Sequence, residues 1–287
     1  MNLLKRVQYK LGAYLRRHFA SLVVNRPYVI HIDAHQELQN KVAVITGGSG
    51  AIGRACAFRL AAEGAKVYVC GSKPNSANSV VEEIRAAGKK ALSVQLNVLD
   101  ADAIAATFQR IANENDGHID ILVNAAGGSA RERANTMVEQ KVEVIDEILN
   151  VNLRGAMLCA KEAAKYMIKN HTGRIINITS VIGLQGKAGF SEYAASKGGS
   201  IAFVKSLAQE LGYHGITVNG VAPGIVQRGE VTFDRLEALG KTNFMASYGK
   251  PEDISAMVFF LCKEEASFIT GQNIAVDGGR SIGLKEM

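Results

Sequence analysis

Three side chains in this sequence have the types and the spacing for proton transfer at an oxygen atom. Tyr193 and Lys197 stand four residues apart in the segment YAASK, which places both on one face of a helix. An ammonium a few ångströms from a phenol favours the phenolate, so Lys197 is expected to lower the pKa of Tyr193 from about 10 by roughly one to three. Ser180 ends an apolar run, residues 174–179. If that run is a strand, the hydroxyl emerges at its carboxyl end, where open parallel sheets bind ligands.

A tyrosine and a lysine at this spacing are also typical of an ordinary helix surface, so the rest of the chain must decide. A glycine-rich segment, GGSGAIG at residues 47–53, follows a predicted buried strand at 41–46 and precedes a helical pattern at 54–62. Glycines between a strand and a helix let the backbone approach a pyrophosphate, which then meets the positive end of the helix. A glycine string alone indicates only a turn, whereas this context indicates a dinucleotide site.

The same order of strand, turn and helix continues along the chain. Short apolar runs predict further strands at residues 66–71, 91–98, 119–124, 174–180, 216–221 and 273–276, with helical stretches between most of them. This alternation predicts an α/β fold, a doubly wound (Rossmann) parallel sheet of seven strands with helices on both faces. No internal repeat or low-complexity linker interrupts it, so residues 40–287 are predicted to form a single Rossmann-fold domain.

Together these segments resemble the short-chain dehydrogenase/reductase family, in its compact branch. The resemblance covers about residues 40–283. Within the family, the chain resembles the 3-oxoacyl-carrier-protein reductases and the sugar or polyol dehydrogenases. The matching segments follow the family's order: the glycine turn at 46–53, NAAG at 124–127, NVNL at 150–153, Ser180 with YAASK, NGVAPG at 219–224, GKPED at 249–253 and the tail at 269–279.

The resemblance implies hydride transfer between a nicotinamide and a ketone or secondary alcohol, with Asn152, Ser180, Tyr193 and Lys197 as the catalytic set. Tyr193 would be the general acid and base at the substrate oxygen, which Ser180 would hold. Lys197 would also bind the nicotinamide ribose, and Asn152 would kink its helix and hold a water that connects Lys197 to solvent. These roles are chemically coherent, because a developing alkoxide needs a hydrogen-bond donor and then a proton.

The second predicted strand is followed by no acidic residue, although NAD-binding folds place an Asp or Glu there on the ribose hydroxyls. Ser72 and Lys73 could instead hold a 2′-phosphate, so NADP(H) is expected in preference to NAD(H). The alternative is a solvated Lys73 and an enzyme indifferent to that phosphate. The resemblance implies these cofactor contacts: Thr46, Gly47, Ser49, Ala51, Ile52, Gly53, Ser72, Lys73, Asn97, Val98, Asn124, Ala125, Gly127, Tyr193, Lys197, Pro223, Gly224 and Val226.

Four cations lie in loops that the resemblance places around a small carbonyl or alcohol substrate: Arg131, Arg133, Lys187 and Arg228. They could receive a carboxylate, a phosphate or an acyl-carrier thioester. Ordinary solvated loop charges are the favoured interpretation, and an anion site is the alternative.

The net charge of +6 belongs to the beginning of the chain. Six basic residues and no acid lie in residues 1–32, so residues 33–287 sum to zero, and no nucleic-acid partner is expected. Residues 1–39 form a predicted extension with a basic amphipathic helix. That helix could pack on the domain or a neighbouring subunit, contact an anionic membrane through residues 1–24, or be a cleaved targeting peptide.

Composition predicts a globular cytoplasmic protein, with peripheral membrane association as the alternative. Hydrophobic residues make up 47% of the chain, but no apolar run has transmembrane length. The four cysteines lack metal-ligand spacing, so we expect reduced core thiols and no metal site. The resemblance implies a homo-oligomer, either a tetramer or a dimer. Two other functions stay open: a non-catalytic dinucleotide-binding scaffold, and a membrane-recruited reductase of a lipid or polysaccharide pathway.

Overall fold

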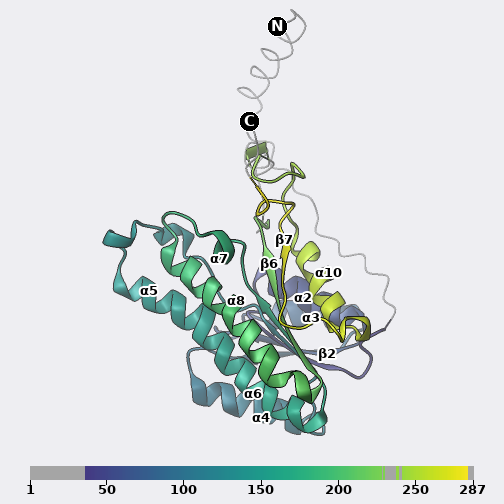
Figure 1. Ribbon diagram of the computed structural model, residues 1–287. Coiled ribbons are helices and arrows are strands. Elements are labelled where there is room, and N and C mark those ends of the chain that lie inside the picture. The colour runs from purple at the N-terminus through teal and green to yellow at the C-terminus, as the bar shows by residue number, and fades with distance from the viewer. Residues whose placement is uncertain (1–35, 228, 230–236, 239–240, 284–287) are drawn as a thin grey trace, which may run out of the picture.

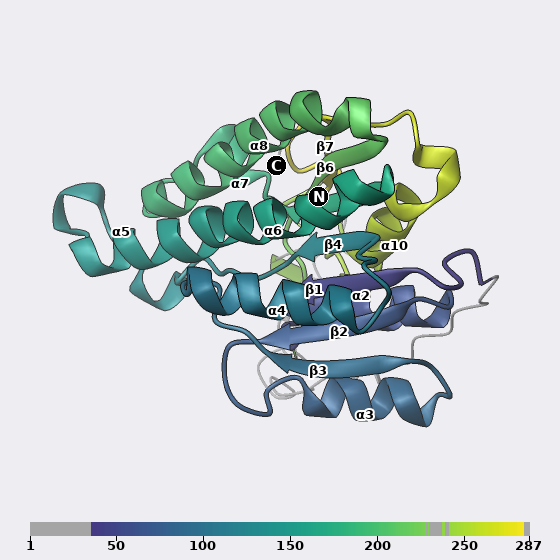
Figure 2. The same cartoon turned by 90° about the horizontal axis from the view of Figure 1, so that it is seen from below.

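The apolar runs of the sequence form one parallel sheet. The structure, a computed structural model, describes residues 36–227, 229, 237–238 and 241–283. Within these residues the seven strands lie in the order β3-β2-β1-β4-β5-β6-β7, and Figure 2 shows the arrows of β1 to β4 pointing the same way. Their bounds are β1 (Val42–Thr46), β2 (Lys66–Gly71), β3 (Ala91–Gln95), β4 (Ile121–Asn124), β5 (Gly173–Ile178), β6 (Ile216–Pro223) and β7 (Asn273–Val276). The predicted doubly wound fold is confirmed.

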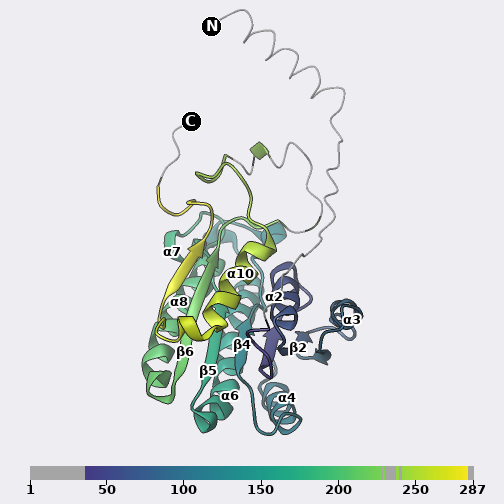
Figure 3. The ribbon, with the colours of Figure 1, turned by 90° about the vertical axis from the view of Figure 1, so that its right-hand side faces the viewer.

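Helices cover both faces of the sheet, as Figures 1 and 3 show. The apolar sides of α4, α6 and α8 pack against one face, and those of α2, α3 and α10 pack against the other. The short helices α5 and α7 lie toward the carboxyl ends of the strands. The bounds are α2 (Ala51–Ala62), α3 (Asn78–Ala86), α4 (Ala101–Asn113), α5 (Val142–Leu149), α6 (Gly155–Asn170), α7 (Ile182–Gln185), α8 (Ser191–Leu211) and α10 (Pro251–Cys262).

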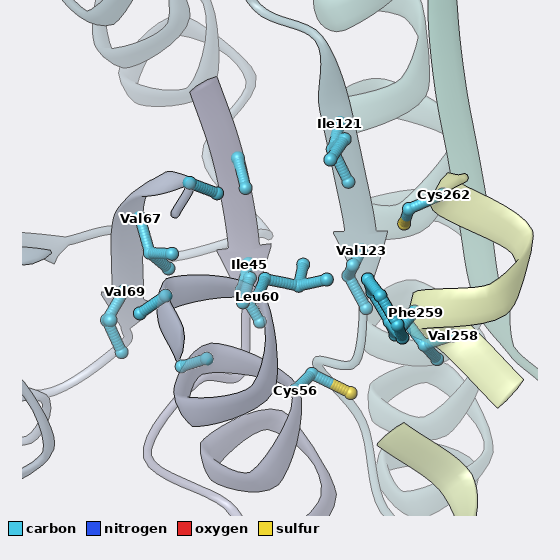
Figure 4. Close-up of a cluster of buried hydrophobic side chains, with 14 of the residues drawn as sticks. Ile45, Cys56, Leu60, Val67, Val69, Ile121, Val123, Val258, Phe259 and Cys262 are labelled. Carbon is cyan, nitrogen blue, oxygen red and sulfur yellow. The ribbon is translucent and has the colours of Figure 1, made fainter. Parts of the chain in front are cut away.

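Figure 4 shows one of the two cores, where α10 meets α2 over the middle of the sheet. Val258, Phe259 and Cys262 of α10 lie in one buried cluster with Cys56 and Leu60 of α2. Burying a side chain of this size stabilises the fold by about 1.5–3 kcal/mol, so this contact anchors the C-terminal segment that completes the sheet.

The four cysteines are buried and unpaired, as the sequence predicts. Burial raises the pKa of the Cys56 and Cys159 thiols to about 12, and burial also raises those of Cys70 and Cys262. These thiols are protonated and unreactive at neutral pH.

The carboxyl ends of the strands form a crevice between β1 and β4. The strands β2 and β3 lie on one side of β1, and the strands β4 to β7 lie on its other side. Open α/β sheets bind ligands at such a reversal of strand order. In the part of the chain described, no helix has both the length and the apolar character to cross a bilayer.

The third strand is shorter than the predicted run of 91–98, because polar side chains turn the backbone after Gln95. The Oδ1 atom of Asn97 accepts the N–H of Leu99 at 3.1 Å. The Oδ1 atom of Asp100 then accepts the N–H groups of Asp102 and Ala103 at 3.1 and 2.9 Å, which starts α4. A side chain that caps a helix in this way ends the strand before it.

Replacing this cap is expected to destabilise the fold without touching the crevice. Asp100→Ala removes both side-chain bonds and should lower the free energy of unfolding by about 1 kcal/mol, measured by urea denaturation. Asp100→Asn keeps an acceptor oxygen, so its free energy of unfolding should fall much less. An alanine variant with an unchanged midpoint would contradict the role of the cap.

Candidate active site

The crevice contains a cavity of about 490 Å³ at the carboxyl ends of the strands. Its lining comes from the glycine turn after β1, the loop after β4, the segment from the end of β5 through α7, the start of α8, the loop after β6 and the tail after β7. Segments far apart in the sequence therefore meet at one place.

The glycine turn forms one end of this cavity because side chains do not fit there. Gly47 has a φ of +64°, and a Cβ on it would lie 2.6 Å from the backbone nitrogen of Ala126. A Cβ on Gly53 would lie 2.3 Å from the carbonyl oxygen of Gly47. Helix α2 starts after Gly50 without a side-chain cap or an acidic first turn, so its N-terminus is open to an anion. The turn fits the pyrophosphate of a dinucleotide.

Tyr193, Lys197 and Ser180 line the same cavity. The Nζ atom of Lys197 donates to the carbonyl oxygen of Ile178 at 2.6 Å, which fixes the ammonium at the end of β5. From there it lies 6.0 Å from the centroid of the Tyr193 ring. The Ser180 oxygen accepts the N–H of Ile182 at 3.2 Å, so its own O–H can be donated to a ligand.

Asn152 lies behind the cavity, on a π-helical turn, Asn150–Arg154, that joins α5 to α6. Its Oδ1 atom accepts the N–H of Gly128 and its Nδ2 atom donates to the carbonyl oxygen of Gly128, both at 3.0 Å. The Nδ2 atom also donates to the Ser196 hydroxyl at 3.1 Å, and that hydroxyl donates to the carbonyl oxygen of Tyr193 at 2.8 Å. The wide turn thus directs one amide at both the β4 loop and α8.

The expected contacts divide into two groups. The lining of the cavity contains Gly47, Ala51, Ile52, Gly53, Ala125, Gly127, Ser180, Tyr193, Lys197, Pro223, Gly224 and Val226. Outside that lining are Thr46, Ser49, Ser72, Lys73, Asn97, Val98, Asn124 and Asn152.

Two residues outside the lining hold the loops that form it. The Thr46 hydroxyl accepts the N–H of Ala126 at 3.3 Å. The Asn124 amide donates to Asn177 at 2.9 Å and to the carbonyl oxygen of Ala156 at 3.1 Å. These bonds join the ends of β1, β4 and β5 to α6.

The four loop cations do not share one position. Arg131 and Lys187 line the cavity. Arg133 instead forms two hydrogen bonds with Glu147 of α5, at 2.8 and 2.9 Å, and these bonds raise the pKa of Arg133. Arg228 lies outside the described residues. Arg280 joins the lining from the tail, although no pattern in the sequence singled it out.

Comparisons with known proteins agree with this geometry. The model of a family described as short chain dehydrogenase matches residues 41–237. The chain is 40% identical over 244 residues to a 3-oxoacyl-[acyl-carrier-protein] reductase of Synechocystis, covering 84% of this chain and 97% of that protein. It is 40% identical over 247 residues to one of Aquifex aeolicus, covering 85% and 98%. A crystal structure of a candidate gluconate dehydrogenase from Agrobacterium tumefaciens matches with a TM-score of 0.80 and 29% identity, covering 88% of this chain and all of that one.

Removing the Asn152 amide is expected to loosen the site. Asn152→Ala leaves the N–H and carbonyl groups of Gly128 without their partner, which should lower the free energy of unfolding by about 1–3 kcal/mol. The matched control is Asn150→Ala, because Asn150 lies on the same π turn with an exposed side chain. Equal loss in both variants would mean that the turn, and not the amide network, determines stability.

Proposed function

The chain belongs to the short chain dehydrogenase family, whose members are NAD(P)-dependent oxidoreductases acting on CH–OH groups, and we propose that it transfers hydride between NADP(H) and a ketone or secondary alcohol. One observation carries the proposal: Tyr193, Lys197 and Ser180 line the same cavity as the glycine turn. A proton donor and a dinucleotide site therefore meet at the point where a carbonyl would be reduced.

The residues of the turn fit a dinucleotide, since a Cβ at Gly47 or Gly53 would clash with neighbouring backbone, and only glycine lets the turn pack this closely beside the open N-terminus of α2. When bound, the nicotinamide supplies or accepts the hydride. The Tyr193 hydroxyl gives its proton to the substrate oxygen as negative charge develops there, and Ser180 donates a hydrogen bond to the same oxygen. Lys197 would stabilise the phenolate that remains, and it would bind the nicotinamide ribose.

Asn152 is a positioning residue in this proposal, because its hydrogen bonds go to Gly128 and Ser196 and it lies outside the cavity lining. By holding Ser196, which bonds the backbone of Tyr193, it keeps the tyrosine at a fixed place relative to the β4 loop. This role comes in addition to the water that Asn152 is expected to hold beside Lys197.

The preference for NADP(H) rests on the end of β2. Residues 71–81 contain no acidic residue that could bind the ribose hydroxyls. Ser72 and Lys73 are exposed directly after Gly71, so a 2′-phosphate could reach both of them. A homo-oligomeric assembly and a cytoplasmic location remain predictions.

Removing the tyrosine hydroxyl is expected to stop the chemistry and spare the cofactor. Tyr193→Phe should lower turnover by about 10²–10³ or more, as is typical for one such donor, and keep the affinity for NADPH in a fluorescence titration. Tyr213→Phe is the matched control, because that side chain is 99% exposed. A Tyr193→Phe enzyme with normal turnover would remove the tyrosine from the mechanism.

Removing the charge of Lys73 is expected to change the affinity for NADPH and not that for NADH. Lys73→Gln should weaken NADPH binding by roughly tenfold through the loss of one charge-assisted contact, and leave NADH binding unchanged. Lys90→Gln makes the same change in net charge at the opposite end of the sheet, beside the start of β3, and serves as the control. If both coenzymes respond equally to Lys73→Gln, the preference for the phosphate does not come from this residue.

A further inference from the structure

The cavity carries positive charge that the proposed chemistry does not use. Among the described residues that line it, Arg131, Lys187, Lys197 and Arg280 are cationic, and none is an aspartate or glutamate. Lys197 is held at the end of β5 and belongs to the catalytic set. The other three come from three separate segments: the loop after β4, the loop between α7 and α8, and the tail after β7.

The backbone directs Lys187 at this cavity. Gly186 and Gly189, on either side of it, have φ angles of +71° and +76°, which side chains rarely adopt. The Nζ atom of Lys187 lies 4.6 Å from the centroid of the Phe190 ring, which is buried in the same lining. Partial burial, together with the charges of Arg131 and Arg280, lowers the pKa of Lys187. Both arginines therefore place like charge near the Lys187 ammonium, in the lining that all three residues share.

Arg280 is held in the lining by bonds at both ends of its turn. Its Nη1 atom donates to the carbonyl oxygen of Thr242 at 3.1 Å. The Asp277 carboxylate accepts the N–H groups of Gly279 and Ser281 at 2.9 and 2.7 Å. The Gln185 amide, at the end of α7, donates to the carbonyl oxygen of Ser281 at 2.7 Å, which ties the tail to the segment before Lys187.

Two arginines of the same turn, Arg131 and Arg133, differ in whether they reach the cavity. Both lie in one 3₁₀ turn, Arg131–Arg133, after Ala130 in a left-handed conformation with a φ of 42°. The guanidinium of Arg133 is occupied by Glu147. Arg131 instead lines the cavity with Lys187 and Arg280, and no ion pair between any of these three and a described carboxylate is seen.

We propose that Arg131, Lys187 and Arg280 bind an anionic group of the substrate, a carboxylate or a phosphate, while its carbonyl lies at Tyr193 and Ser180. This inference rests on the proposed function and gives it a substrate class: acidic ketones or the corresponding hydroxy acids and hydroxy phosphates. Three cations from three segments cost repulsion in the free enzyme, and one anion relieves all of it at once. The phosphates of the cofactor already have their own site at the glycine turn and the N-terminus of α2.

The test compares matched charged and neutral ketones with NADPH. The carboxylate series is 3-oxobutanoate, 4-oxopentanoate, 5-oxohexanoate and 6-oxoheptanoate, each beside its ethyl ester, and the phosphate arm is dihydroxyacetone phosphate beside dihydroxyacetone. The wild-type enzyme should prefer the charged member of at least one pair by roughly tenfold to a hundredfold in kcat/KM, which corresponds to one or two charge-assisted contacts. Salt should reduce that preference. The arm that shows it identifies the anion as carboxylate or phosphate.

The variants Lys187→Gln and Arg280→Gln should each lower kcat/KM for the charged ketone by roughly tenfold and leave its neutral partner unchanged. Arg133→Gln is the matched control, since it removes a loop arginine that lies outside the cavity. No preference in the wild-type enzyme, or equal losses for charged and neutral ketones, would overturn the proposal. If the variants bind NADPH more weakly, the cations bind the cofactor and not the substrate, and this result would also overturn the proposal.

A failure of the proposed function can be distinguished from a failure of the anion site, because binding can be measured without turnover. If no probe is reduced, calorimetric titration of the NADP-saturated protein with the same charged ketones measures the anion site without turnover. Binding that Lys187→Gln abolishes and Arg133→Gln retains would support the anion site alone. No binding of any charged probe would overturn it.

Discussion

The active site depends on one side-chain amide, that of Asn152, which bonds three segments of the chain together. Two of its bonds close on the backbone of Gly128, in the loop after β4, and a third goes to Ser196 on α8. Ser196 stands between Tyr193 and Lys197 in the sequence and bonds the backbone of the tyrosine. The lining of the cavity and the reactive pair are therefore held in one arrangement by groups that are themselves buried. Such networks are worth most when every member is satisfied.

The parallel sheet makes this arrangement possible because it brings the carboxyl ends of all strands to one edge. The end of β1 provides the glycine turn, β4 provides the loop that Asn152 holds, and β5 ends at Ile178, whose carbonyl oxygen fixes Lys197. The glycine turn, Tyr193 and the loop cations then line different parts of one cavity. Positive charge at the proton donor comes from Lys197, and positive charge at the mouth comes from residues on separate loops.

Much of this could be predicted from the sequence, because strands buried on both faces are continuous apolar runs. The runs at 66–71 and 273–276 match β2 and β7 in full, whereas the run at 91–98 was three residues too long because Asn97 and Asp100 turn the chain. Resemblance, and not pattern, singled out Asn152, since its bonds require a π turn that no periodicity reveals. The sequence left open whether Arg133 faces the substrate, because its partner, Glu147, lies on another element. Arg280 was missed because only the folded tail brings it to the cavity.

The measurement that tests the central claim most directly is a thermal-shift titration of the wild-type protein with NADPH, NADP⁺, NADH and NAD⁺. A ligand present at about 100 times its Kd adds roughly 2.7 kcal/mol to the stability, which is visible as a higher Tm. A marked rise in Tm is expected with NADPH and NADP⁺, and a smaller one with NADH and NAD⁺. If none of the four raises the Tm, the cavity is not a nicotinamide dinucleotide site, and the account of this site is contradicted.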